Sequence, residues 1–278
     1  MRLIVDAGST KMEWILLDGE RIAEHFTTSG YNPNYNDPII FIDILYKELR
    51  QDFPVVDAVY YYGSGCGSDA NREDVAQLLR VRFEEANEVI VTHDLMAACH
   101  AVLGHEKGIT CILGTGSNSC VYDGERIIGR TASLGYLVGD EGSGMHIGKE
   151  VVRAYFYGFM PEDLRRQFAD AFHLEQKDFI QQLYHNEQPS KYLASFAKFA
   201  GEHQNEPFIH DLVQGCFEAF VKVFVSRFVD CKTLRICFVG SVAYHFQGIL
   251  KECLEMHGLT MGAVMQSPAE GLIRYHQS

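Results

Sequence analysis

The same pattern of residues occurs twice in this 278-residue chain, and the repeat constrains the fold more than any other feature. Residues 3–22 read LIVDAGSTKMEWILLDGERI, and residues 110–127 read TCILGTGSNSCVYDGERI. Each copy predicts strand, glycine turn, strand, Asp-Gly turn and strand, because apolar runs bounded by turn residues are typical of hairpins. One shared DGERI can arise by chance, since surface hairpins favour such residues. The matching order of elements favours a duplicated domain.

The rest of the chain alternates strand and helix patterns, which indicates an α/β fold. After the first copy we expect helices over 37–53, 71–86 and 94–105, a strand that ends in the glycines at 63–67, and a buried strand over 88–93. After the second copy, 146–230 is largely helical, with breaks near Pro161, Pro189 and Pro207. A strand over 234–240, a helix over 241–258, a strand over 259–266 and a short terminal helix complete the chain. We expect the domain boundary in the helix near 95–107, and we recognise no motif in 161–205.

The charge of the chain restricts its partners. Lys and Arg number 24 against 37 Asp and Glu, which gives a formal net charge of −13. This argues against a nucleic-acid or anionic membrane surface, because either would need a basic patch. An anionic ligand must then be held by backbone amides or by a metal ion.

The N-terminal stretch and the cysteines indicate the compartment in which we expect the protein. The N-terminal apolar stretch is too short for a signal peptide, and no apolar window is long enough to span a membrane. The eight cysteines are scattered without a CxxC pair, which is typical of reduced, buried thiols in a cytoplasmic protein. No Cys and His spacing suggests zinc.

Two glycine turns are candidate phosphate sites. Residues 6–10 read DAGST and residues 114–118 read GTGSN, and small residues let backbone N–H groups approach a ligand. Asp6 is placed to hold Mg²⁺ through water, whereas the second turn offers the same donors without a carboxylate. The alternative is a pair of ordinary hairpin turns, which also favour Gly, Ser and Asn.

Two further positions lie at predicted strand ends. Asp94 follows the strand 88–93 and is a candidate general base, although Asp is also a favoured helix N-cap. The glycines at 63–67 lack GxGxxG spacing, so they form either a plain strand-to-helix turn or a wall of a substrate cleft. A GxxxxGK[ST] phosphate loop is absent from the sequence.

Glycine-rich segments in the second half are candidates for substrate and nucleoside binding. Residues 135–148 carry five glycines around Asp140 and Glu141, and carboxylates accept hydrogen bonds from sugar hydroxyls. The alternative is an irregular connection that caps the following helix. Residues 240–242 read GSV after a strand, and they either receive adenosine or form an ordinary strand-to-helix turn.

Together these motifs resemble the acetate and sugar kinase/Hsp70/actin superfamily, and within it the N-acetylglucosamine kinases and the BadF/BadG/BcrA/BcrD ATPase family. The resemblance extends over the whole chain, and GDEGS at 139–143 is its most specific motif. It implies two actin-like (ribonuclease H-like) domains, 1–100 and 101–278, with a duplicated sheet core around a nucleotide cleft. The second domain would carry a helical insertion, and the terminal helix would pack back on the first domain.

The resemblance also implies roles for individual residues. Asp94 would be the catalytic base and would touch the sugar, and Asp6 would hold Mg²⁺ through water. The residues implied for ATP are Asp6, Gly8, Ser9, Thr10, Lys11, Gly114, Thr115, Gly116, Ser117, Gly240 and Ser241. The residues implied for the sugar are Asn32, Gly65, Asp94, Gly135 and Asp140.

The function implied is ATP-dependent phosphorylation of an amino sugar: N-acetylglucosamine or a relative such as N-acetylmuramic acid or glucosamine. A homodimer is expected from the resemblance alone. An alternative is an ATPase that acts as a conformational switch on a protein partner, and a third is a sugar sensor without chemistry. The dehydratase-activator branch of this family carries cysteines for a bridging iron–sulfur cluster, and no comparable cysteine motif occurs here, which makes an activator less favoured. The zinc-binding cysteine cluster of bacterial glucokinase-type relatives is missing too.

Overall fold

The computed structural model describes residues 1–186 and 188–277 and divides the chain into two compact units. The first unit runs from Met1 to Gly104 and takes up the chain again from Pro268, whereas the second is His105–Ser267. The predicted boundary lay after residue 100, within a helix. The structure keeps that helix whole in the first unit, because its buried residue Ala97 packs with Ile4 and Leu272 in a core of that unit.

The first sheet has five strands in the order β3-β2-β1-β4-β5. Strands β1, β2 and β3 form an antiparallel meander, and β1, β4 and β5 run parallel. Their bounds are β1 (Arg2–Ala7), β2 (Lys11–Asp18), β3 (Arg21–Ser29), β4 (Ala58–Gly63) and β5 (Glu88–His93). The carboxyl ends of the three parallel strands therefore lie side by side, next to the β1–β2 turn.

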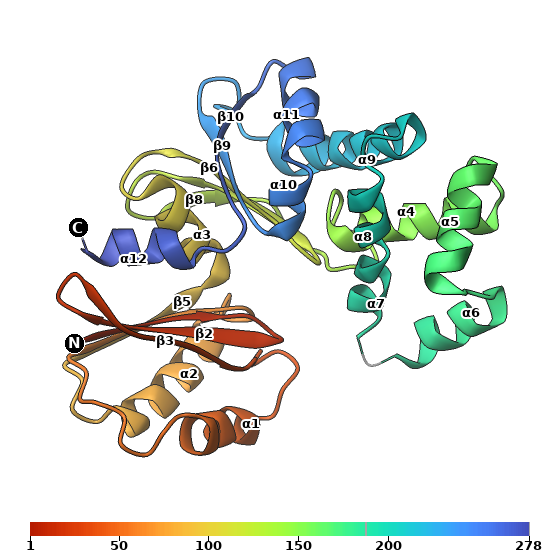
Figure 1. Ribbon diagram of the computed structural model, residues 1–278. Helices are drawn as coiled ribbons and strands as arrows, with labels where there is room; N and C mark the ends of the chain where they lie inside the picture. The colour runs from red at the N-terminus through yellow and green to blue at the C-terminus, as the bar shows by residue number, and fades with distance from the viewer. Residues whose placement is uncertain (187, 278) are drawn as a thin grey trace. The chain divides into compact units, whose positions relative to one another are not determined.

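Helices cover both faces of this sheet (Figure 1). One face carries α1 (Pro38–Asp43), the π-helical turn η1 (Ile44–Glu48) and α2 (Asp69–Arg82). Leu3 and Val5 of β1 point to that face, whereas Ile4 packs on the other with Ala97 and Leu272. The second face carries α3 (Asp94–Leu103) and α12 (Ala269–Gln277). The alternation of side chains along β1 thus supplies two separate cores.

The terminal helix α12 packs tightly on α3. A Cβ on Gly271 would lie 2.4 Å from the carbonyl oxygen of Ala101, so only glycine fits there. The hydroxyl of Tyr62 on β4 lies 2.9 Å from both His100 Nδ1 of α3 and His276 Nε2 of α12. Burial, together with the nearby Arg2 charge, lowers the pKa of His276 to about 4, so the ring is neutral at physiological pH.

The second sheet repeats the plan of the first. Its order is β10-β9-β6-β7-β8, in which β6, β7 and β8 are antiparallel and β6, β9 and β10 run parallel. The bounds are β6 (Gly108–Leu113), β7 (Ser117–Tyr122), β8 (Ile127–Arg130), β9 (Arg235–Val239) and β10 (Thr260–Met265). The predicted α/β class and the duplicated domain are both confirmed by this equivalence.

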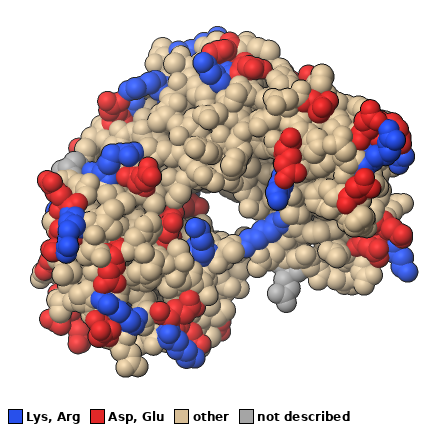
Figure 2. Space-filling model, in the orientation of Figure 1, with Lys and Arg blue, Asp and Glu red and all other residues tan. Residues whose placement is uncertain are grey.

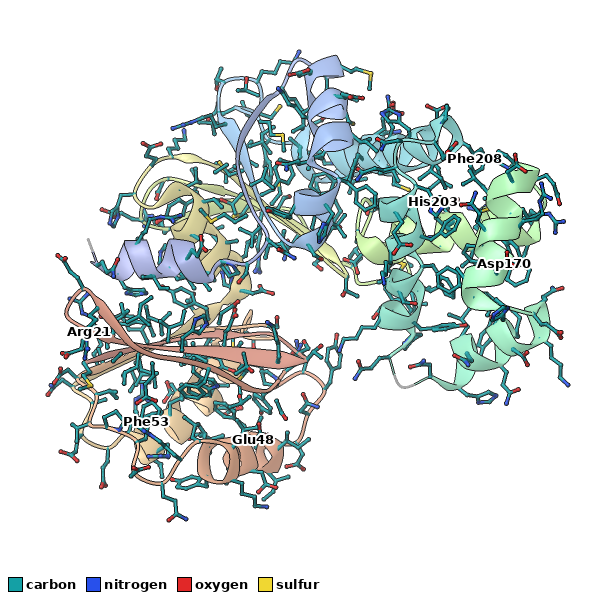
Figure 3. All side chains as sticks on the ribbon, in the orientation of Figure 1. Arg21, Glu48, Phe53, Asp170, His203 and Phe208 are labelled. Atoms are coloured by element: carbon teal, nitrogen blue, oxygen red, sulfur yellow. The ribbon has the colours of Figure 1, made fainter. Side chains whose placement is uncertain are left out.

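Helices pack on this sheet and extend away from it (Figure 1). They are α4 (Gly144–Phe156), α5 (Glu162–Phe172), α6 (Gln176–His185), α7 (Pro189–Ser195), α8 (Ala197–Glu202), α9 (Pro207–Phe220), the π-helical turn η2 (Val221–Val225), α10 (Ser241–His245) and α11 (Gln247–Met256). The breaks near the three prolines are confirmed. Pro189 and Pro207 occupy the first turns of α7 and α9, where a missing N–H costs nothing. His203, labelled in Figure 3, follows α8, and its Nε2 lies 3.0 Å from Gln167 Oε1 of α5.

Two predictions about elements are wrong. The strand over 88–93 is not buried: β5 is the edge of its sheet, and Glu88 and Ile90 are exposed. The helix over 241–258 is broken at Phe246 into α10 and α11, where Phe246 leaves helical geometry with φ −105° and ψ 22°. The ring of Phe246 is buried in the hydrophobic core of the second unit, and the helix breaks at this residue.

The distribution of charged side chains and the burial of the cysteines can be compared with the expectations from the sequence. Acidic and basic side chains are interspersed over the face shown in Figure 2, without a large patch of either sign. All eight cysteines are buried, as predicted. No helix within the described part of the chain has the length and apolarity needed to cross a membrane.

Candidate active site

The β1–β2 turn of the first unit is held from both sides. The Gly8 N–H donates to the Lys11 carbonyl at 3.0 Å, and the Gly30 N–H donates to the Thr10 carbonyl at 2.9 Å. A Cβ on Gly30 would lie 2.4 Å from the Thr10 backbone, so glycine alone permits this close approach. Ser9 and Thr10 are exposed at the tip of the turn. Their hydroxyls are thus available to a ligand.

Asn32 lies directly against this turn. Its Nδ2 donates to Ser9 Oγ at 2.8 Å, and its Oδ1 accepts from the Asn34 N–H at 3.0 Å. Gly65 has a φ of +82°, and a Cβ there would lie 2.1 Å from Asn32 Oδ1. The structure therefore brings together three predicted residues: Ser9 from the phosphate turn, and Asn32 and Gly65 from the sugar set.

Asn71 at the start of α2 holds the two loops of this group together. Its Nδ2 lies 2.8 Å from Asn34 Oδ1 and 2.7 Å from the Gly65 carbonyl oxygen. The sequence did not single out Asn71, since a polar residue in the first turn of a helix is an ordinary feature. Only its contacts mark it as a support for Asn32.

Asp94 is the first residue of α3 and stands at the end of β5. Its Oδ2 accepts a hydrogen bond from Ser64 Oγ at 3.2 Å. The Ser64 N–H in turn donates to the Ala7 carbonyl at 2.8 Å, so Ser64 links the first turn to Asp94. Burial raises the pKa of Asp94, whereas the Ser64 hydroxyl and backbone N–H groups lower it. Ser64 was missed, although it lies in the glycine segment 63–67.

Asp6 precedes the first turn at the end of β1. Its pKa is raised to about 7, mainly by burial and then by the negative charges of Glu13 and Asp94, while Lys11 opposes the shift. The Lys11 ammonium lies 3.7 Å from Glu13 Oε1 and is largely exposed. Three carboxylates therefore share a region with little positive charge. A hydrated Mg²⁺ beside Asp6 fits this donor set, because oxygen ligands and neutralisation of charge are what the site offers.

The residues of the second turn include no carboxylate, as predicted, but a carboxylate from a later loop lies against the turn. Asp140 Oδ1 accepts from the Ser117 N–H at 3.1 Å, and a Cβ on Gly116 would lie 3.0 Å from Asp140 Oδ2. Asp140 adopts a positive φ of 61°, and burial raises its pKa while the Ser117 N–H lowers it. The N–H of Ser117 is thus already bonded. Asp140, predicted for the sugar, and Gly116, predicted for phosphate, lie side by side.

The turn after β9 packs on the second turn. Gly240 has a φ of +126°, and a Cβ there would lie 2.2 Å from the Leu113 carbonyl oxygen. Its N–H donates to the Met265 carbonyl at 2.9 Å. Ser241 then begins α10. The glycine is required here because the positive φ and the close backbone both exclude a side chain.

A cavity of about 680 Å³ opens beside these two turns. It includes the predicted Gly114, Thr115 and Ser241, and α7, α8 and α10 supply most of the other walls. The lining residues are Gly114, Thr115, Gly144, Lys191, Ala194, Ser195, Ala197, Lys198, Gly201, Glu202, Gln204, Ser241, Val242, His245 and Phe246. The α7 and α8 residues fall in the segment 161–205, where no motif was recognised, because their helical pattern resembles any core helix.

Gly135 lies outside these groups. It has a φ of +73° and forms an exposed turn in which its carbonyl accepts from the N–H groups of Val138 and Gly139. No other group lies within 4 Å of the position its Cβ would take. The structure therefore places Gly135 in the turn that leads to Asp140, where its carbonyl is hydrogen-bonded to the residue next to Asp140.

The whole chain matches a solved structure. The "Putative N-acetylglucosamine Kinase" of Porphyromonas gingivalis has 37% sequence identity to this chain and a TM-score of 0.95, with 100% of this chain and 99% of that chain covered. The chain belongs to the N-acetylglucosamine kinase family. This assignment confirms the family predicted from the sequence motifs.

Other solved structures share the fold of this N-acetylglucosamine kinase family member. The "Putative N-acetylglucosamine Kinase" of Chromobacterium violaceum has 16% identity and a TM-score of 0.75, covering 99% of this chain and 98% of that one. A ROK family glucokinase of Streptomyces griseus, solved with glucose and AMPPNP, has 16% identity and a TM-score of 0.55, covering 99% and 97%. Neither a protein-family model nor a curated protein matches the sequence.

Proposed function

We propose that this protein is an ATP-dependent kinase that phosphorylates an amino sugar, N-acetylglucosamine or a close relative. The observation that carries the proposal is the position of Asp94 in a member of this family. Its carboxylate stands at the end of a parallel strand, is held by Ser64 at 3.2 Å, and lies close enough to Asp6 to raise that residue's pKa. Ligand sites in such sheets lie beyond the carboxyl ends of the strands.

Asp94 acts as the general base. Its carboxylate takes the proton of a sugar hydroxyl as the hydroxyl oxygen bonds to the γ-phosphorus of ATP, and the bond between that phosphorus and the β,γ-bridging oxygen breaks to release ADP. Burial raises the basicity of Asp94, which favours acceptance of the proton. The rest of the catalysis is positioning and stabilisation of charge.

The glycine turns and the cavity bind the nucleotide. Backbone N–H groups and the exposed hydroxyls of Ser9 and Thr10 donate to phosphate oxygens, and Asp6 holds Mg²⁺ through water. Bound Mg²⁺ supplies the positive charge that phosphoryl transfer needs. The cavity beside Gly114 and Ser241 receives the nucleoside, since about 680 Å³ lies in the usual range of ligand pockets.

Asn32 and Asp140 recognise the sugar. A carboxylate accepts hydrogen bonds from hydroxyls, and an asparagine amide both donates and accepts. Asn32 is held by the Ser9 hydroxyl and the Asn34 N–H, and Asp140 is held by the Ser117 N–H, so both side chains are fixed before a ligand binds. Gly135, on its exposed turn, remains a predicted sugar residue.

ADP release from Mg-ATP, measured across a panel of amino sugars, tests the proposal. We expect N-acetylglucosamine, N-acetylmuramic acid or glucosamine to stimulate turnover, with the phosphate position identified by NMR. Asp94→Asn should keep ATP binding and lower sugar-dependent turnover by at least about a hundredfold. If no sugar stimulates ADP release but a protein partner does, the conformational-switch ATPase is correct instead. Dimerisation and a cytoplasmic location stay predictions.

A further inference from the structure

The cavity of the second unit has one end built around the glycine turn. A Cβ on Gly144 would lie 3.3 Å from the Gly114 carbonyl oxygen, 3.3 Å from Val242 Cγ2 and 3.5 Å from Ala194 Cβ. The Gly144 N–H also donates to the Gly114 carbonyl at 2.8 Å. The β6–β7 turn, the first turn of α10 and the last turn of α7 therefore converge at this end.

The other end lies between α8 and the residue that follows α10. A Cβ on Gly201 would have only the Phe246 ring within 4 Å, at 3.7 Å. Phe246 is one helical turn beyond Val242, and Gly201 lies on α8, seven residues beyond Ala194 of α7. Gly201 has no side chain and the Phe246 ring is buried, so this end of the wall leaves room for a planar base. The glycine turn suits phosphate, and this end suits the base.

Lys191 lies on α7 one turn before Ala194 and Ser195, on the side away from Gly201. Residues three and four apart share one helix face, so Lys191 continues the wall that Ala194 forms against Gly144. Lys198 lies on α8, four residues after Ala194, on the side toward Gly201. Its ammonium is 3.7 Å from Glu202 Oε1, and its side chain is 82% exposed.

We propose that Lys191 binds the phosphates of the nucleotide in this cavity. This rests on the proposed function only for the identity of the ligand as a nucleoside polyphosphate. The charge of the site supports it: the protein has a net charge of −13, and Asp140 places a carboxylate against the same glycine turn. Without a cation, backbone N–H groups alone would have to offset the repulsion between these negative charges and the phosphates. An ammonium at the turn end of the cavity neutralises phosphate directly.

The proposal makes Lys191 a determinant of selectivity for phosphorylated nucleosides. A charge-assisted hydrogen bond to phosphate stabilises ADP but not adenosine, because adenosine has no group at that end. Removing the ammonium should weaken ADP binding by roughly 10- to 100-fold and leave adenosine binding unchanged. Lys251 on α11 lies outside the lining of the cavity, and its ammonium is 3.7 Å from Glu255 Oε1, so its removal should change the affinity for either ligand by less than about twofold.

Calorimetric titration of the full chain with ADP and with adenosine tests this. Lys191→Met keeps the length of the side chain and removes its charge, Lys191→Arg keeps the charge, and Lys251→Met is the matched control outside the cavity. We expect Lys191→Met alone to lose ADP affinity, and Lys191→Arg to retain most of it. Thermal melting of each variant identifies any loss of fold, and Lys191→Gln is the second variant for that case.

Other outcomes overturn the proposal. Equal loss of ADP and adenosine affinity would place Lys191 at the nucleoside, and equal effects of Lys191→Met and Lys251→Met would reduce it to a general surface charge. A wild-type protein that binds neither ligand would remove the nucleotide assignment together with the role of Lys191. The titrations contain no sugar. If Lys191-dependent ADP binding is found but no sugar stimulates turnover, the kinase proposal fails while the role of Lys191 stands.

Discussion

The side-chain amide of Asn32 donates to Ser9 Oγ at 2.8 Å. Ser9 belongs to the turn predicted to hold phosphate, and Asn32 was predicted to hold the sugar. One hydrogen bond thus connects two parts of the site that the sequence separates by the whole of β2 and β3. A substitution in the turn should therefore change the KM for the sugar, which steady-state kinetics can detect.

Ser9→Ala should raise the KM for the sugar as well as the KM for ATP. Loss of one hydrogen bond costs about 1 kcal/mol, which corresponds to roughly fivefold in each constant. Thr10→Val is the control, because it removes the neighbouring hydroxyl without touching Asn32, and it should raise only the KM for ATP. Steady-state kinetics with each substrate varied in turn measures both constants. An unchanged KM for the sugar in Ser9→Ala would show that the hydrogen bond does not position Asn32.

Ser64→Ala should move the acid limb of the pH profile of kcat/KM to higher pH. The Ser64 hydroxyl favours the ionised form of Asp94, so its loss raises the pKa of Asp94 further above the ordinary value. A general base must be ionised, and activity is therefore lost at a higher pH than in the wild type. Ser64→Thr keeps a hydroxyl and should restore the profile. A uniform drop in activity at every pH would contradict this role.

Asp6→Asn should stabilise the protein in metal-free buffer at pH 8. The pKa of Asp6 rises from 3.8 to about 7 on folding, so the folded state binds more protons between these values and stability falls as pH rises through that window. Removing the ionised carboxylate should raise the free energy of unfolding by about 1–3 kcal/mol at pH 8 and by much less at pH 4. Denaturant titrations at both pH values measure this. Asp170→Asn on α5, labelled in Figure 3, is an exposed control that should change little.

Gly240→Ala should destabilise the second unit by more than about 2 kcal/mol. The new Cβ would meet the Leu113 carbonyl oxygen at 2.2 Å, and the φ of +126° is unfavourable for any L side chain. Gly215→Ala is the matched control, since Gly215 lies within α9 with open space around it. That control should gain about 0.5–1 kcal/mol from helix propensity. Equal effects of the two substitutions would mean that the turn can shift to admit a side chain.

Local features of the site could be predicted because they depend on neighbours in the chain. Short apolar runs and Asp-Gly turns specify the two hairpins, prolines begin α7 and α9, and Asp94 follows the strand it was assigned to. These depend on backbone geometry within a few residues. The same reasoning failed for β5, because its pattern does not say whether a strand lies at the centre or the edge of a sheet.

Contacts between distant segments could not be predicted. The second turn itself lacks a carboxylate, as expected, yet Asp140 supplies one from a later loop. Ser64 and Asn71 were not recognised as supports, since their roles exist only where two loops meet. Lys191 lies in a helix without any motif. Its place in the cavity depends on how α7 packs against α4.

The sequence by itself determined the duplicated α/β plan, the two glycine turns and the acidic residue at the end of β5, because periodicity and turn chemistry are local. Only the tertiary structure decided which side chains share a site. Asn32 is joined to Ser9, Asp140 to the second turn, and Lys191 to the cavity by close packing between elements. Close packing depends on the volumes of many side chains at once, and no short stretch of sequence contains that information.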